Sequence, residues 1–70
     1  MKFNEWLKKK REENGYSVQE FARKAQIHRT NVYELEQNGS NPKLDTLTKT
    51  AKAFGMETWR MLKQIEDSHE

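Results

Sequence analysis

Polar side chains that can make hydrogen bonds are concentrated within residues 29–37 of this 70-residue chain. If this segment is a helix, they occupy its outward side and its flanks, while Val32 and Leu35 point the other way. Guanidinium, hydroxyl, carboxylate and amide groups on one helix face can both donate and accept hydrogen bonds. Such chemistry suits the recognition of a polar surface and requires no bond cleavage. The five residues are Arg29, Thr30, Tyr33, Glu34 and Gln37.

Residue types suited to catalysis or metal binding are scattered by comparison. The chain has no cysteine, and its two histidines, His28 and His69, lie far apart without a cluster of ligands around either. No nucleophile–base pair or pair of carboxylates stands out, and a short helical domain has little room for a cleft. We therefore predict that the chain is not an enzyme and that it binds no metal, no cofactor and no small-molecule ligand.

The length and composition predict one small domain. The chain is 33% hydrophobic and 34% charged, which allows a core supplying about 3–5 kcal/mol of net stability. We expect a folded domain over residues 1–66 and a frayed acidic tail over residues 67–70. Because no apolar run suggests a signal peptide or a membrane span, we expect a cytoplasmic protein. We also expect it to be of prokaryotic or phage origin.

Turn signals divide the sequence into helices. Apolar residues recur at helical spacing, and no period-2 alternation indicates a strand, so the predicted fold class is all-α. Ser17 and Glu20 fit a capping box, while Gly15 and Gly55 are stop signals. The predicted helices span about residues 3–14, 17–25, 29–37, 44–54 and 58–66.

Each predicted helix has a face expected to be buried. In the first helix, Phe3, Leu7, Lys10 and Asn14 share one stripe, and Trp6 lies on its flank. The other expected core positions are Val18, Phe21, Ala22, Ala25, Ile27, Val32, Leu35, Leu44, Leu47, Ala51, Phe54, Met61, Leu62 and Ile65.

The second and third predicted helices are joined by only three residues, 26–28. A turn this short forces two helices to cross steeply, so that the second projects beyond the first. A projecting helix fits the major groove of B-DNA, where Arg29 could grip a guanine through two hydrogen bonds. Nine Lys or Arg against six Asp or Glu in residues 1–43 make this part of the chain the more attractive to a negatively charged partner.

Several stretches of the chain resemble the lambda-repressor-like, Cro-type helix-turn-helix family. The resemblance extends over roughly residues 3–65 and implies a compact fold of five helices that binds double-stranded DNA. The stretches are SVQEFA (17–22), IHRTNV (27–32), LE (35–36), NPKLDTL (41–47) and AKAFG (51–55).

The resemblance also assigns roles to individual positions. The residues it implies for contacts to base edges are Arg29, Thr30, Tyr33 and Glu34. Those it implies for contacts to the DNA backbone are Ser17, Gln19, Asn31, Gln37, Asn38, Asn41 and Lys43. Arg11 and Glu36 match a structural pair of the family.

Three positions depart from the family pattern. Val18 replaces a glutamine that often touches DNA, Gln26 replaces a glycine in the turn, and His28 replaces a serine that caps the third helix. These departures concern the geometry of the turn and the anchor of the second helix.

The last predicted helix carries a tryptophan, Trp59, off its apolar stripe, which suggests a surface for a partner. Because many members of the family pair through this helix, we expect a homodimer. The residues expected at its interface are Trp59, Met61, Leu62 and Ile65.

These features predict a sequence-specific DNA-binding transcriptional regulator, a repressor that binds a palindromic operator as a dimer. One alternative is an antitoxin or a restriction-modification controller of the same fold, which could have a protein partner. Another is a protein-interaction module that has lost DNA binding. This alternative is favoured by Val18, by Glu34 and by the low net charge of +2.

Overall fold

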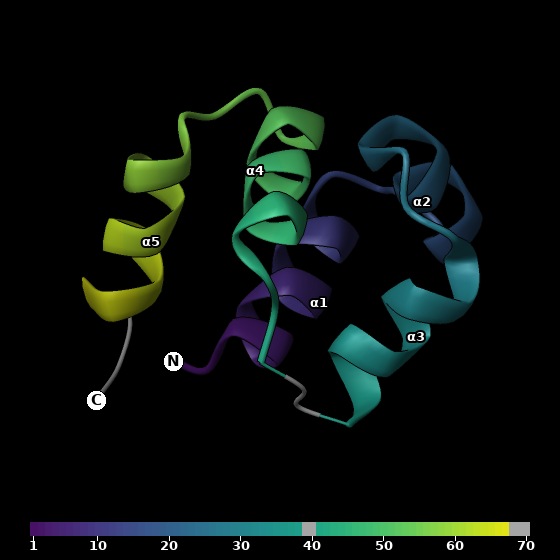
Figure 1. Ribbon diagram of the computed structural model, residues 1–70, viewed down its shortest axis with the longest axis horizontal. Coiled ribbons are helices and arrows are strands. Elements are labelled where there is room, and N and C mark those ends of the chain that lie inside the picture. The colour runs from purple at the N-terminus through teal and green to yellow at the C-terminus, as the bar shows by residue number, and fades with distance from the viewer. Residues whose placement is uncertain (39–40, 68–70) are drawn as a thin grey trace.

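The computed structural model describes residues 1–38 and 41–67, and the described chain contains helices and no strand (Figure 1). This confirms the predicted all-α architecture of five helices. The helices are α1 (Phe3–Glu13), α2 (Val18–Ala25), α3 (Arg29–Gln37), α4 (Leu44–Ala53) and α5 (Thr58–Asp67).

The signals at the ends of the helices act as their chemistry predicts. The Ser17 hydroxyl accepts the Glu20 N–H at 3.1 Å, and the Glu20 carboxylate accepts the Ser17 N–H at 3.1 Å, which completes the capping box of α2. After α1, Gly15 adopts a φ of +70°, and the Tyr16 N–H returns to the Arg11 carbonyl at 3.0 Å. Local sequence therefore sets where these helices begin and end.

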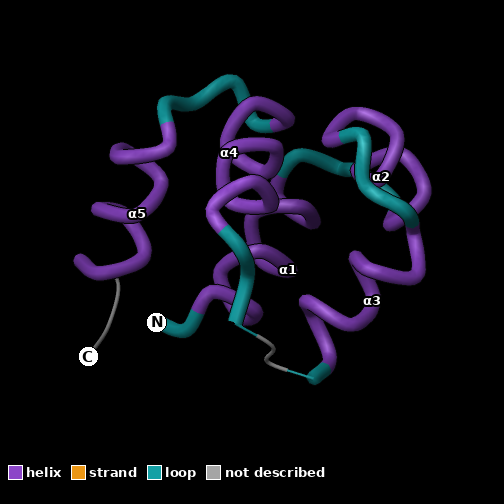
Figure 2. Tube along the Cα trace, viewed as in Figure 1, coloured by secondary structure: helices purple, strands orange, loops and turns teal. Residues whose placement is uncertain are grey.

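The helices pack as two groups around α1 and α4 (Figures 1 and 2). Helix α3 packs against α1 and α2, which leaves it at one edge of the molecule, and α5 packs against α4 at the opposite edge. The N-terminal ammonium donates to the Ile65 carbonyl at 3.3 Å, so the start of the chain also holds α5. Helices α3 and α5 thus lie at opposite ends of a small core.

The core has two clusters that share partly buried phenylalanines. One cluster joins α1, α2 and α3 around Leu7 and Phe21, and the other joins α1, α4 and α5 around Trp6 and Met61. Phe54, which follows α4, packs on both. Its ring lies 5.1 Å from that of Phe21 and meets the ring of Trp6 edge-on at 5.7 Å, so this one side chain connects the two halves.

Some expectations about burial were wrong. Leu44 is 73% exposed. It lies in the first turn of α4, and the neighbouring helices cover only the later part of the apolar stripe of α4. Leu62 is 42% exposed on the flank of α5, whereas Trp6, expected only on a flank, is 5% exposed. Asn14 is exposed because it caps α1, and its side-chain amide donates to the Lys10 carbonyl. Asp67, the first residue of the predicted tail, is the last residue of α5. The rest of that tail, residues 68–70, lies outside the described residues.

Candidate nucleic-acid interface

The turn between α2 and α3 is built around a left-handed residue. Gln26 has φ 57° and ψ 43°, a left-handed conformation. The family pattern has glycine at this position. The Ile27 N–H donates to the Ala22 carbonyl at 2.9 Å, and the partly buried Ile27 packs on the core. Gln26 therefore adopts the glycine geometry at a cost of about 1–2 kcal/mol, and the turn is retained.

His28 caps the third helix. Its backbone is extended, and its Nδ1 atom accepts the Thr30 N–H at 3.2 Å. A ring nitrogen that accepts a hydrogen bond does here what a serine oxygen does at other helix N-termini. The departure from the family pattern at this position thus leaves α3 capped.

Helix α3 separates its apolar and polar sides. Val32 is completely buried and Leu35 is 7% exposed, both within the core cluster formed with α1 and α2. On the other side Tyr33 is 51% exposed, a large fraction for an aromatic side chain. The remaining polar residues of α3 that were predicted to contact DNA are exposed too: Arg29, Thr30, Asn31, Glu34 and Gln37.

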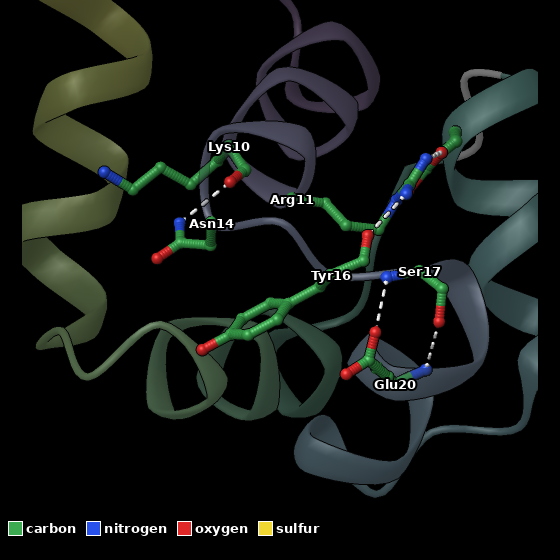
Figure 3. A network of polar contacts seen from close by, with 7 residues as sticks. Lys10, Arg11, Asn14, Tyr16, Ser17 and Glu20 are labelled. Atoms are coloured by element: carbon green, nitrogen blue, oxygen red, sulfur yellow. Dashed lines mark hydrogen bonds and ion pairs between the residues drawn. The ribbon is translucent and has the colours of Figure 1, made fainter.

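The predicted pair of Arg11 and Glu36 is present. Arg11 donates from Nε to Glu36 Oε2 at 2.7 Å and from Nη2 to Oε1 at 3.1 Å, while Nη1 donates to the Tyr16 carbonyl at 2.8 Å (Figure 3). The hydrogen bond to Glu36 raises the pKa of Arg11 above its usual value. Because one guanidinium joins α1, the α1–α2 connection and α3, the pair holds the last turn of α3 in position.

A shallow hollow of about 270 Å³ adjoins the outer face of α3. It brings Asn31 and Glu34 of α3 together with Asn41 and Lys43, which precede α4. Thr46 also lines it, a residue that our sequence analysis did not single out. The pattern of α4 alone could have flagged Thr46 only as a polar residue one turn after the Asn41-Pro42 signal.

The other predicted backbone contacts lie apart from this hollow. Ser17 and Gln19 are exposed at the beginning of α2, and the Ser17 oxygen accepts the Glu20 N–H. Gln37 and Asn38 are exposed at the end of α3. The candidate interface therefore consists of α3, the start of α2 and the segment before α4.

The residues expected at a dimer interface divide into two groups. Trp59 is 58% exposed and Leu62 is 42% exposed, and Ile65 is half-buried. Met61 is completely buried between α1 and α4, so its assignment to an interface is corrected: it is a core residue. The outer face of α5 offers Trp59 and Leu62, with Arg60 Cζ lying 5.4 Å from the centre of the Trp59 ring.

Two further kinds of feature are absent from the described chain. Residues 1–38 and 41–67 hold no group of three His, Asp or Glu side chains that could bind a metal. Within the same residues, no helix is long and apolar enough to span a membrane.

Comparison with known proteins agrees with this geometry. Residues 7–58 match the model of a helix-turn-helix family. The chain is also 33% identical over 66 residues to the "HTH-type transcriptional regulator DdrOP3" of Deinococcus deserti. That alignment covers 94% of this chain and 51% of the relative, so the chain spans about half the length of the protein it matches.

Proposed function

The chain belongs to the helix-turn-helix family, and we propose that it is a sequence-specific DNA-binding transcriptional regulator whose α3 reads an operator. The family is not one of enzymes, which agrees with the prediction made from the sequence. The name of the relative, a transcriptional regulator, supports the proposed role in transcription.

The observation that carries this proposal is the composition of the exposed side of α3. Arg29 lies in its first turn, where a guanidinium entering the major groove can bond guanine O6 and N7 together. Thr30 can contact a thymine methyl, and Glu34 can accept from the amino group of cytosine. A solvated helix would more commonly carry alternating Lys and Glu on this side, which makes the mixture of donors, acceptors and one aromatic ring informative.

Contacts to the DNA backbone complete the proposed interface. Ser17 and Gln19 at the start of α2, with Asn41 and Lys43 before α4, flank α3 in the chain and can approach phosphates on either side of the groove. Backbone contacts of this kind fix the register of a reading helix and supply affinity that falls with salt. Tyr33, Asn31, Gln37 and Asn38 add further donors along the same face.

The proposed regulator acts as a homodimer. A single helix of this length reads few base pairs, and two-fold pairing doubles the site and makes the operator palindromic. The outer face of α5 supports this idea, because Trp59 and Leu62 are large apolar side chains exposed together. Such a dimer would repress by occupying a promoter.

Selection of bound sequences from a random duplex pool tests the proposal, followed by titration of the enriched duplex at two salt concentrations. We expect one palindrome to be enriched and its affinity to fall steeply with salt. Failure to enrich any sequence at either salt concentration contradicts DNA reading and favours a protein-interaction module.

Sedimentation at micromolar concentration tests the dimer separately. We expect a dimer, and we expect Trp59→Ala to shift it toward monomer without loss of helix content. A wild-type chain that sediments only as monomer at this concentration contradicts the proposed α5 interface.

A further inference from the structure

A second polar surface lies on α2 and α4, away from the α3 interface. Asp45, Thr48, Lys49 and Lys52 follow one another at helical spacing and share one face of α4. This face meets the end of α2 and the turn after it, around a hollow of about 350 Å³. The residues lining the hollow are Lys24, Ala25, Gln26, Asp45, Thr48, Lys49 and Lys52, none of which lines the hollow beside α3.

Charge is concentrated around this hollow. Three lysines and one aspartate give it a net charge of +2, which equals the formal net charge of the whole chain. An anionic partner would be attracted to this local excess of positive charge.

Two of the lysines contact neighbouring groups. Lys24 Nζ lies 5.2 Å from the centre of the Tyr16 ring, and Lys49 Nζ lies 3.3 Å from an Asp45 carboxylate oxygen. A side chain that already makes such a contact loses less conformational entropy when a ligand binds. Lys52 is exposed at the rim, and the Gln26 amide and the Thr48 hydroxyl can add neutral hydrogen bonds.

We propose that the hollow between α2 and α4 is a docking site for an acidic segment of a partner protein. Its lining comes from α2, α4 and the turn after α2 and includes the small, buried Ala25, which leaves room for an extended peptide to approach the ammonium groups. Carboxylates spaced along such a segment would pair with Lys24 and Lys52, while Lys49 stays bound to Asp45. Because no lining residue belongs to the proposed DNA interface, the protein could bind DNA and this partner together.

The test uses a short synthetic peptide of aspartate and glutamate residues, titrated into the isotope-labelled chain and followed by amide chemical shifts. We expect shifts confined to the C-terminal end of α2, the turn after it and the polar face of α4. The double variant Lys24→Gln/Lys52→Gln should bind the peptide about tenfold more weakly. A matched control, Lys8→Gln/Lys9→Gln, removes the same charge from the exposed side of α1 and should bind as the wild type does.

Two results would overturn the proposal. Equal losses in both double variants, or shifts spread over every lysine, mean that the peptide responds only to overall charge. A duplex that displaces the peptide, together with weaker duplex binding by Lys24→Gln/Lys52→Gln alone, assigns the hollow to DNA phosphates. Helical circular dichroism of each variant confirms that it is folded before the titration.

Discussion

Arg11 of α1 and Glu36 of α3 form a two-point ion pair, with N–O distances of 2.7 and 3.1 Å, whose side chains are only 11% and 5% exposed. The same guanidinium bonds the carbonyl of Tyr16. A largely buried pair is most costly to break from one side, because the remaining charge has lost both water and partner.

Removal of one member of this pair should therefore destabilise the domain strongly. We expect Arg11→Ala or Glu36→Ala to lower the free energy of unfolding by about 2–4 kcal/mol, as measured by urea denaturation. Arg11→Met/Glu36→Leu should be closer to the wild type than either single variant, since it leaves no unpaired charge. Single variants that lose less than the double variant would show that the pair contributes little.

The two kinds of DNA contact should respond differently to substitution. We expect Arg29→Ala to lose about 1–3 kcal/mol on the preferred duplex and to relax the preference at one base pair. Lys43→Ala should weaken binding to all sequences alike and reduce the salt slope by about one. Lys8→Ala, on the exposed side of α1, serves as the control; identical behaviour of all three variants would argue against base reading by Arg29.

The left-handed Gln26 predicts a stabilising substitution. Gln26→Gly removes a steric cost of about 1–2 kcal/mol from the folded state. It also increases the conformational entropy of the unfolded chain, which costs about 0.5–1 kcal/mol of stability. We therefore expect the free energy of unfolding to rise by about 0.5–1 kcal/mol. Gln26→Ala keeps the steric cost and should bring no such gain. Thermal unfolding of the three chains measures the difference, and a Gly variant no more stable than the Ala variant contradicts the prediction.

Thr50 is completely buried in α4, and its hydroxyl has no hydrogen-bond partner in the structure. An unsatisfied buried hydroxyl costs about 1–3 kcal/mol. Thr50→Val replaces it with a methyl group of similar shape, and we expect a gain of about 1 kcal/mol, or about 4–8 °C in Tm. Thr50→Ala, which leaves a cavity as well, should not share this gain. A less stable Val variant would indicate that the hydroxyl is satisfied in solution.

The capping box of α2 predicts a dependence of stability on pH. Hydrogen bonds from the Ser17 backbone and hydroxyl lower the pKa of Glu20 below its ordinary value of 4.5. Because the folded-state pKa lies below the unfolded-state pKa, Glu20 contributes its full stabilisation at pH values above the unfolded-state pKa. This contribution is lost as the pH falls through the folded-state pKa. Unfolding measured between pH 7 and pH 3 should therefore depend less on pH in Glu20→Gln, which can still cap Ser17 without titrating. An unchanged pH profile would count against this role.

Much of the fold follows from short-range rules. The helix bounds agree with the sequence prediction within one residue, because capping residues, glycines and the three-residue turn act on the backbone nearby. The division of α3 into a buried and an exposed side follows from its periodicity in the same way. The positions of Arg11 and Glu36 came from resemblance to a family, and no local signal pairs them.

Periodicity could not determine how far the core extends along each helix. Leu44 and Ala51 share one stripe of α4, yet one is 73% exposed and the other is completely buried, because neighbouring helices cover only part of the stripe. Trp6 lies on the flank of the apolar stripe of α1 and is nevertheless buried, because α4 and α5 pack against that flank.

The sequence by itself determined where the helices lie, which side of α3 is polar and which family the chain resembles, since these depend on residues close together in the chain. Apart from the Arg11–Glu36 pair, which the family resemblance implied, only the tertiary structure showed which distant groups lie together. It brought Lys24 to Lys49 and Lys52, and Asn31 to Lys43, and it left the Thr50 hydroxyl without a partner. The physical reason is that such contacts depend on the packing of whole helices against one another, which spacing along one helix does not specify.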